Sequence, residues 1–369
     1  MSWTVTDHTN VHGAPLGTFA PAAYVFQGQH HVVYQGFSST GGSDGRIHEF
    51  YWAGHWELNE LTNAAGAPAI GGFSPTAYTF GNTQHVLYQG APSDGMIHEL
   101  WWDDGWNHNE LTHATTPVAP PVLNDAIGYA FEPDNTQNVA YQSTNPDHIH
   151  ELKWDNGWTH QDLTGSFGGT PSTSSPDAYE FTPIGTRQVV YTGNEGNKGS
   201  FIGGHVHEFL WDNNGWRDTD LHLHVPAPPP PLASGQPTAY AFRTQETKHV
   251  NFTGDDGNIH ELWWNFDGWR HNNLSAVTGA PSPGPGVVVT GYAAEAQSTQ
   301  HVVYGGLDGS IHELMWVNGV WTHNNLSDPP TLAPPSISSR IATYVFVDNS
   351  QHLFYIGSNH HLIELWMDA

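Results

Sequence analysis

Alternating apolar and polar positions recur along the chain in seven similar copies. Each copy opens with a Tyr that stands two residues before an apolar position, and successive Tyr residues lie about 50 to 60 positions apart. Alternation of period two is typical of a strand with one buried face, and this repeat length is typical of propeller blades rather than helical solenoids. The seven residues are Tyr24, Tyr78, Tyr129, Tyr179, Tyr240, Tyr292 and Tyr344.

Each copy contains four strand patterns. The first is Ala-Tyr-x-Phe, as at 77–80, and the second is His-Val-x-Tyr, as at 85–88. The third is Ile-His-Glu-Leu-x-Trp, as at 97–102, and the fourth is a Gly-Trp pair that ends in Leu-Thr, as at 157–164. Asp-Gly, as at 44–45, often separates the second and third patterns and predicts a two-residue hairpin turn in which both residues have positive φ. We therefore predict four antiparallel strands in each copy.

The two ends of the chain complement each other. The seventh copy stops at 366–369, after its third strand, and the segment 3–9 matches the fourth-strand pattern at 158–164. We predict that the N-terminal segment pairs with the last blade and closes a ring, which leaves only short, protected sheet edges. The predicted fold is all-β: one domain, 1–369, that forms a seven-bladed β-propeller. The expected blades are 20–62, 73–112, 124–164, 174–222, 236–275, 287–327, and 338–369 together with 1–9.

The third strand contains a Glu in every copy. These residues are Glu49, Glu99, Glu151, Glu208, Glu261, Glu313 and Glu364. By period two, the Glu shares a face with the residue two positions later. That later position varies, and we interpret it as a platform for a ligand: Tyr51, Trp101, Lys153, Leu210, Trp263, Met315 and Trp366. The next residue is a Trp in six copies and faces the other way, so we expect it to pack between blades: Trp52, Trp102, Trp154, Trp211, Trp264 and Trp316.

The fourth strand contains a Trp in every copy: Trp3, Trp56, Trp106, Trp158, Trp216, Trp269 and Trp321. An acceptor follows four residues later: Asp7, Glu60, Glu110, Asp162, Asp220, Asn273 and Asn325. A ring beside a fixed acceptor suits a sugar, whose C–H groups lie on the aromatic face while its hydroxyls donate to the carboxylate. Packing of the ring together with capping of the strand end explains the same pattern equally well.

Histidine recurs at two positions of the repeat. One set opens the second strand, namely His31, His85, His249, His301 and His352. The other set precedes the third-strand Glu, namely His48, His98, His150, His207, His260 and His312. The segment 205–208 places two imidazoles on one strand face, which is a possible metal site. In the recurrent copies, however, the neighbouring His and Glu point to opposite faces, so we predict no metal ion and no cofactor.

Charge and composition narrow the function. The chain has 36 acidic residues against 9 Lys plus Arg, a formal charge of −27, and 26 His. Nucleic acid and anionic membranes are therefore improbable partners. The chain has no Cys, no apolar run of the roughly 18 residues that span a bilayer, and no signal-peptide pattern at its start. We expect a soluble protein made in the cytoplasm, with release by a signal-independent route left open.

Catalysis is not expected. A sialidase-type propeller enzyme would need a cluster of Arg residues, but the six Arg of this chain stand at unmatched positions of the repeat. Every acidic residue that could act in catalysis also recurs in several copies, whereas an active site needs one particular set of catalytic residues. We predict that the protein is not an enzyme and that it binds a ligand at several copies of one site.

These repeats resemble the bacterial seven-bladed propeller lectins of the Photorhabdus type over essentially the whole chain. The resemblance rests on His-Val-x-Tyr, Asp-Gly-x-Ile-His-Glu-Leu-x-Trp and Gly-Trp. It implies a lectin that recognises L-fucose, with galactose-type or O-methylated sugars as further ligands, in shallow pockets between blades. The implied partners are fucosylated or related glycans on glycoconjugates, and a dimer or tetramer is expected.

The repeat is also similar, more loosely, to the six-bladed fungal fucose lectins, in which an Arg of the second strand, a Glu of the third and an aromatic ring hold the sugar. By position, the second-strand His would replace that Arg. Repeats three and four have Asn138 and Gln188 there, with Lys153 and Leu210 on the platform, so we expect their sites to be the weakest. The alternative is a protein-binding scaffold without a sugar site. The candidate sugar-binding residues are Trp3, His31, Glu49, Tyr51, Trp56, His85, Glu99, Trp101, Trp106, His249, Glu261, Trp263, Trp269, His301, Glu313, Trp321, His352, Glu364 and Trp366.

Overall fold

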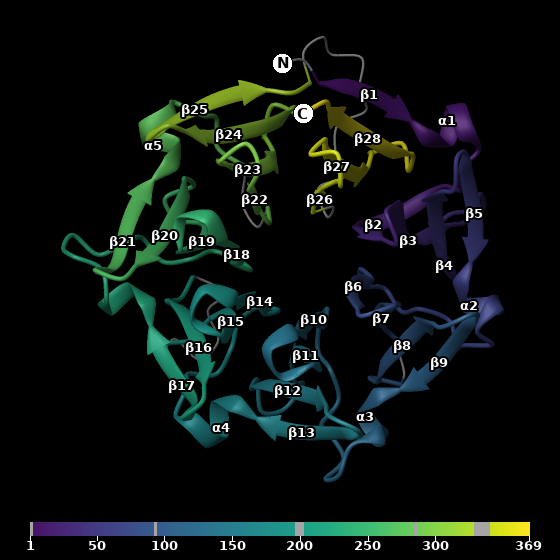
Figure 1. Cartoon of the computed structure of the whole chain (residues 1–369), viewed down its shortest axis with the longest axis horizontal. Coiled ribbons are helices and arrows are strands. Elements are labelled where there is room, and N and C mark those ends of the chain that lie inside the picture. The colour runs from purple at the N-terminus through teal and green to yellow at the C-terminus, as the bar shows by residue number, and fades with distance from the viewer. Residues whose placement is uncertain (1–2, 92–93, 196–202, 284–286, 328–339) are drawn as a thin grey trace.

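The strands form a ring of seven four-stranded antiparallel sheets, seen end-on in Figure 1. The computed structural model describes residues 3–91, 94–195, 203–283, 287–327 and 340–369. Residues 1–2 and 338–339 of the expected seventh blade therefore lie outside the described residues. The predicted seven-bladed propeller with four antiparallel strands in each blade is confirmed. Among the described residues, no helix has the length and apolar character that a membrane crossing requires.

The strands follow the chain from the centre of the ring to its rim (Figure 1). Blade 1 contains β2 (Gly17–Phe26), β3 (Gln29–Phe37), β4 (Ser43–Trp52) and β5 (Trp56–Glu60). Blade 2 contains β6 (Thr76–Phe80), β7 (Thr83–Gln89), β8 (Ile97–Trp102) and β9 (Trp106–Glu110). Blade 3 contains β10 (Ile127–Phe131), β11 (Thr136–Gln142), β12 (Ile149–Trp154) and β13 (Trp158–Asp162). Blade 4 contains β14 (Asp177–Phe181), β15 (Thr186–Thr192), β16 (Val206–Asp212) and β17 (Gly215–Asp220).

The remaining blades repeat this order. Blade 5 contains β18 (Thr238–Phe242), β19 (Thr247–Thr253), β20 (Ile259–Asn265) and β21 (Gly268–Asn273). Blade 6 contains β22 (Thr290–Ala294), β23 (Thr299–Gly305), β24 (Ile311–Val317) and β25 (Val320–Asn325). Blade 7 contains β26 (Ala342–Val345), β27 (Gln351–Ile356), β28 (Leu362–Met367) and β1 (Thr4–Asp7). Short helices follow most outer strands: α1 (His8–His12), α2 (Leu61–Ala64), α3 (Leu111–Ala114), α4 (Leu163–Phe167), η3 (Leu221–Leu223) and α5 (Leu274–Thr278). Single 3₁₀ turns join the first two strands in three blades: η1 (Glu132–Asp134), η2 (Thr182–Ile184) and η4 (Arg243–Gln245).

The hydrophobic core lies between the blades. In one such layer, Val33 and Ile47 of blade 1 pack with Val86 and Leu100 of blade 2, and all four side chains are buried. The Trp that ends the third strand joins the same layers, as Trp102 of blade 2 meets Phe26 of blade 1 edge to face at 5.8 Å. Because each layer draws on two neighbouring blades, a blade cannot bury its apolar faces alone.

The Asp-Gly turns differ from the predicted type. The Gly has positive φ, 63° at Gly95 and 74° at Gly45, which lies inside β4 rather than in a turn, but the preceding Asp does not. Instead, Asp94 Oδ1 accepts a hydrogen bond from the backbone N–H of Met96, and Asp94 Oδ2 lies 3.0 Å from Nε2 of His98. The Asp therefore holds the turn through its side chain and fixes the recurrent His that precedes the third-strand Glu.

The N-terminal strand β1 completes the last blade. It pairs antiparallel with β28, with Thr4 opposite Trp366 and Asp7 opposite Ile363 (Figure 1). The Thr9 hydroxyl accepts from the backbone N–H of Leu362 at 3.0 Å, just as the Thr112 hydroxyl does for Ile97 in blade 2. The predicted closure of the ring by the N-terminal strand is confirmed, and the Thr9 contact shows that β1 continues as a fourth strand does in another blade.

A buried His secures the same seam. His8 is fully buried, and its Nε2 lies 2.8 Å from Oε2 of Glu364 on β28. Its ring also packs against Phe50 and Trp56 of blade 1, with centroids 5.1 and 4.6 Å apart. One residue of the N-terminal segment thus joins blade 7 to blade 1.

Deletion of residues 1–9 tests the contribution of this seam. It removes the β1 ladder and the contact between His8 and Glu364, and each lost hydrogen bond costs about 0.5–1.5 kcal/mol. We expect a melting temperature lower by the order of 10 °C and greater aggregation from the exposed edge. Scanning calorimetry of both proteins measures this, and a synthetic peptide of residues 1–12 should restore part of the loss. A truncated protein that melts like the full chain contradicts the closure.

The seam should also respond to acid. Burial alone would raise the pKa of Glu364, but hydrogen bonds from His352 and His8 outweigh it and hold the pKa at about 2. A lowered pKa stabilises the fold above the ordinary value of 4.5, and this stabilisation falls as pH drops from about 4.5 through about 2. We expect Glu364→Gln to remove about 3 kcal/mol of the pH dependence in that window. Urea unfolding of both proteins at pH 7, 4 and 3 measures the difference, and equal pH slopes would refute the assignment.

Candidate functional site

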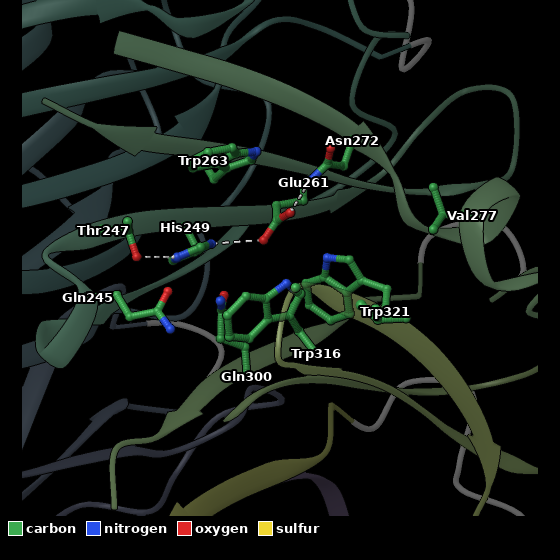
Figure 2. A pocket seen from close by; sticks show the side chains of 12 residues that line it. Gln245, Thr247, His249, Glu261, Trp263, Asn272, Val277, Gln300, Trp316 and Trp321 are labelled. Carbon is green, nitrogen blue, oxygen red and sulfur yellow. Dashed lines mark hydrogen bonds and ion pairs between the residues drawn. The ribbon is translucent and has the colours of Figure 1, made fainter. Parts of the chain in front are cut away.

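A pocket opens between neighbouring blades on the outer half of the ring. Figure 2 shows the one between blades 5 and 6, with a volume of about 540 Å³. Blade 5 contributes a polar wall and one ring: Thr247, His249, Glu261, Trp263 and Asn272. Blade 6 contributes the facing wall of Gln300, Trp316 and Trp321. The pocket therefore has aromatic rings from two blades and polar groups between them.

Two further pockets occupy equivalent positions of the ring. The pocket between blades 2 and 3 has a volume of about 640 Å³ and is lined by His85, Glu99, Trp101, Asn109, Gln137, Trp154 and Trp158, among others. The pocket between blades 7 and 1 has a volume of about 500 Å³ and is lined by His8, His30, Trp52, Trp56, His352, Glu364 and Trp366, among others. The same arrangement thus recurs at three interfaces.

The third-strand Glu is the buried centre of each polar wall. Glu261 is only 1% exposed, and its Oε1 accepts from Nδ1 of His249 at 2.8 Å. Its Oε2 accepts from the Asn272 amide at 2.7 Å, and Nε2 of His249 hydrogen bonds with the Thr247 hydroxyl at 2.7 Å. The carboxylate thereby fixes an imidazole of the second strand and an amide of the fourth (Figure 2).

The same network is present in other blades. Glu99 bonds to His85 and Asn109, at 2.9 Å each. In blades 1 and 6 the corresponding groups are His31, Glu49 and Asn59, and His301, Glu313 and Asn324. In blade 7, His352 takes the first place, at 2.7 Å, and His8 replaces the amide. Five blades therefore hold the Glu with an imidazole of their own second strand.

The fourth-strand Asn was missed by the sequence reasoning, although its signal is present. It stands three residues after the fourth-strand Trp in repeats one, two, five and six: Asn59, Asn109, Asn272 and Asn324. The acceptor expected four residues after the Trp is instead the cap of a short helix, as Glu110 accepts from the backbone N–H of His113 and Asp162 from that of Gly165. Glu99 lies opposite Asn109 in the ladder, and His98 lies opposite Glu110. The capping explanation therefore describes this position better than a dedicated sugar acceptor does.

The fourth-strand Trp residues serve the pocket on the side of the preceding blade. Trp321 lines the pocket with blade 5, and Trp56 lines the pocket with blade 7. Trp106 packs into the layer between blades 1 and 2, and Trp3 into the layer between blades 6 and 7. The structure thus separates each Trp from the Glu of its own repeat, because the two point to opposite faces of the blade.

The platform positions differ from one blade to the next. Trp101, Trp263 and Trp366 line the three pockets. The Tyr51 ring stacks on His31 with centroids 5.6 Å apart, and its hydroxyl donates to Glu57. Trp316, which follows the platform position of blade 6, also lines a pocket, and its ring centroid lies 6.3 Å from that of Phe242. The Trp after the platform position therefore both packs between blades and faces the pocket.

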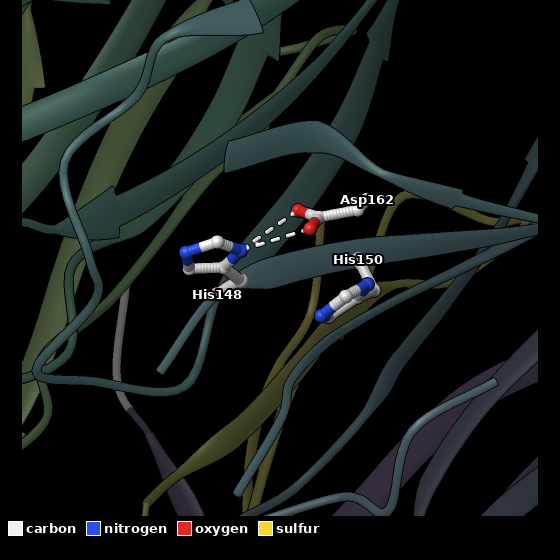
Figure 3. A group of neighbouring side chains, drawn as sticks. All are labelled: His148, His150 and Asp162. Carbon is white, nitrogen blue, oxygen red and sulfur yellow. Dashed lines mark hydrogen bonds and ion pairs between the residues drawn. The ribbon is translucent and has the colours of Figure 1, made fainter. Parts of the chain in front are cut away.

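Among the residues that the structure describes, one group of side chains outside the pockets has the composition of a metal site. His148, His150 and Asp162 come together at the rim of blade 3, as Figure 3 shows. Nδ1 of His148 lies 2.9 Å from Asp162 Oδ2, and the two ring nitrogens of His150 hydrogen bond with His160 and Ser143. Burial lowers the pKa of His150 to about 4. With both nitrogens of His150 engaged and Asp162 capping α4, these contacts form a hydrogen-bond network within the blade.

Comparisons with known proteins extend this picture at the level of the fold. No protein-family model matches the sequence, and none of the curated proteins matches it. Among solved structures, the BP39L lectin from Burkholderia pseudomallei is similar, with a TM-score of 0.70 at 17% identity over 96% of each chain. The six-bladed lectin of Aleuria aurantia, described with a novel fucose recognition mode, has a TM-score of 0.51 at 17% identity over 84% of this chain and 95% of that one. AofleA from Arthrobotrys oligospora has a TM-score of 0.51 at 16% identity over 88% and 90%. The fold of this chain is therefore similar to the β-propeller fold of these lectins.

Proposed function

We propose that this protein is a multivalent lectin that binds L-fucose and related neutral sugars, of galactose or O-methylated type, in the pockets between its blades. The observation that supports this function is that aromatic rings lie opposite a buried Glu held by an imidazole at three interfaces, with an Asn as the second partner of the Glu at two of them. Repetition of one site suits binding to glycoconjugates, which present many copies of one sugar. The similarity to lectin propellers supports the same reading.

The chemistry of the pocket favours a sugar. Trp263 and Trp321 offer flat apolar surface for the C–H groups of a pyranose. Asn272 and Gln300 offer donors and acceptors for its hydroxyls, while Glu261 keeps Asn272 and His249 in place. Because these groups are already oriented, a sugar would lose little affinity to their ordering. A volume of about 540 Å³ is in the range of small-molecule sites.

The charge of the protein favours neutral sugars. With a formal charge of −27 and buried carboxylates in the polar walls of the pockets, a sialic acid or uronic acid would meet repulsion. A dimer or tetramer would multiply the sites further without changing any of them. The alternative of a protein-binding scaffold is an outcome of the tests below.

Monosaccharide titration tests the ligand class. We expect L-fucose to bind with a dissociation constant on the order of mM to tens of μM, and a multivalent fucosylated surface to raise avidity about 10²- to 10⁴-fold. Calorimetry and competition against such a surface measure both, with a sialoside as the charged control. If no neutral sugar gives heat while a protein partner binds, the scaffold function replaces the lectin.

Variants of the pocket between blades 2 and 3 test the site. Trp101→Ala should remove the platform and lower sugar affinity there by about 1–2 kcal/mol, about 5- to 30-fold. Glu99→Gln should weaken the same site, because the amide oxygen cannot serve both His85 and Asn109, and its equal volume should keep the fold. Lys153→Ala, at the platform position of blade 3, is the matched control. Occupancy in fucose-soaked crystals measures the effect, and full occupancy of this pocket in the Trp101→Ala variant would refute the platform assignment.

A further inference from the structure

The buried third-strand Glu has a basic partner in all seven blades, but the source of that partner changes. In blades 1, 2, 5, 6 and 7 it is a His of the same blade. Blades 3 and 4 have Asn138 and Gln188 at this position, and there the next blade supplies the partner. Arg187 of blade 4 reaches Glu151 of blade 3, and Lys248 of blade 5 reaches Glu208 of blade 4.

The geometry of these two ion pairs is close. Nη2 of Arg187 donates to Glu151 at 3.2 Å, and its Nη1 donates to the Asn138 side-chain oxygen at 2.9 Å. Nζ of Lys248 donates to both Glu208 oxygens, at 2.8 and 2.9 Å. Both cations are only 2% exposed. The shorter side chain at 138 thus provides both the space and an acceptor for the guanidinium.

A change of the basic partner involves two positions: the second-strand residue of the same blade and the residue that faces the Glu from the next blade. Where the Glu has its own His, the facing position of the next blade is a Gln at four of the five interfaces and His30 at the interface of blades 7 and 1. Gln84, Gln300 and Gln351 accept the hydroxyl of Tyr24, Tyr240 and Tyr292, and His30 hydrogen bonds with the Tyr344 hydroxyl at 2.6 Å. Gln137 likewise accepts the hydroxyl of Tyr78. Arg and Lys have no acceptor atom, and Tyr129 and Tyr179 accordingly donate to Glu151 and Glu208. At the two interfaces with a cation, the His of one blade and the Gln of the next are therefore both changed: to Asn138 and Arg187 at one, and to Gln188 and Lys248 at the other.

The cations also cover the aromatic surface of their interfaces. The Arg187 guanidinium lies 4.7 Å from the Trp211 ring and 5.1 Å from the Trp216 ring. Lys248 Nζ lies 5.2 Å from Trp264 and 4.9 Å from Trp269 in the same way. Trp216 and Trp269 are only 7% and 8% exposed, whereas the other fourth-strand Trp residues retain more exposed surface. The ring faces that a sugar would need at these two interfaces are therefore already occupied.

We propose that Arg187 and Lys248 close the interfaces between blades 3 and 4 and between blades 4 and 5, so that these act as inter-blade ion-pair clasps and sugar binding is confined to the other five interfaces. This inference rests on the proposed lectin function. In this proposal each cation pairs with the buried Glu of the preceding blade and covers the Trp rings that a sugar would contact at the other interfaces.

Energetics explain why the exchange needs both positions. Burial raises the pKa of Glu151 and lowers the pKa of Lys248, as expected of charges withdrawn from water. Removing only one partner of such a pair leaves an uncompensated buried charge and is strongly destabilising. A paired change keeps a basic donor beside the carboxylate, so it can alter the surface while keeping the fold.

Reciprocal double variants test the proposal. Asn138→His with Arg187→Gln copies His85 of blade 2 and Gln137 of blade 3 into the closed interface and should add one fucose site, weaker than the others because Lys153 stands at its platform position. His85→Asn with Gln137→Arg copies the closed interface into the open one and should remove one site. Calorimetric stoichiometry and fucose-soaked crystals measure both, and wild type should bind at most five sugars per chain. Arg187→Gln alone should lower the melting temperature, and adding Asn138→His should recover part of that loss.

The outcomes separate the two proposals. Sugar bound against Trp216 or Trp269 in wild type, or an undiminished site in the His85→Asn/Gln137→Arg variant, would overturn the closure. If wild type binds no sugar at any interface, the lectin function fails. In that case the melting temperature alone tests whether the two cations hold the blades together, and an Arg187→Gln variant as stable as wild type would refute that role.

Discussion

The buried Glu of the third strand is the constraint around which each blade is organised. A carboxylate removed from water must be hydrogen bonded and balanced, or it destabilises the fold. In blade 5 this need ties together three strands: Glu261 of β20 holds His249 of β19 and Asn272 of β21. The polar wall of the pocket is therefore a consequence of satisfying one buried charge, and its groups are positioned before any ligand arrives.

The interfaces between blades give the second half of the site. Because apolar layers form between neighbouring blades, the face of one blade that bears the Glu always meets the opposite face of the next. That opposite face presents Trp316 and Trp321 at the interface of blades 5 and 6 (Figure 2). The same rings thus pack the interface and line the pocket, so a group that covers them reduces the pocket surface. At the interfaces of blades 3 and 4 and of blades 4 and 5, Arg187 and Lys248 lie over Trp216 and Trp269 in this way.

The last blade is completed by the two ends of the chain. At this seam, β1 comes from the N-terminal end, and His8 occupies the place that the fourth-strand Asn has in blades 1, 2, 5 and 6. His8 contacts Glu364 on one side and the rings of Phe50 and Trp56 on the other. The seam is therefore held by the same kind of carboxylate network as the other blades, but one of its members, His8, comes from the opposite end of the chain.

Much of the architecture follows from local pattern. Period-two alternation, the recurrent Tyr, and the match of 3–9 to 158–164 determine the strands, the number of blades and the closing strand, because each depends on residues near in sequence or on exact repetition. The turn type was mispredicted, since the side chain of Asp94 bonds to the turn backbone and to His98, which strand patterning does not reveal. The short helices after the outer strands were likewise not predicted, although Asp7, Asp162 and Asn273 are residue types that commonly cap a helix N-terminus.

What the tertiary structure alone decided is which residues face one another across an interface. The sequence by itself grouped Glu99 with Trp101, because period two places them on one strand face, and it added His85 only through the resemblance to the fungal fucose lectins. It did not pair Glu151 with Arg187 or Glu208 with Lys248, nor place Trp158 beside Glu99 rather than beside Glu151. Those contacts join different repeats, and they depend on the direction in which each blade packs against the next, a property of the closed ring that no single repeat contains.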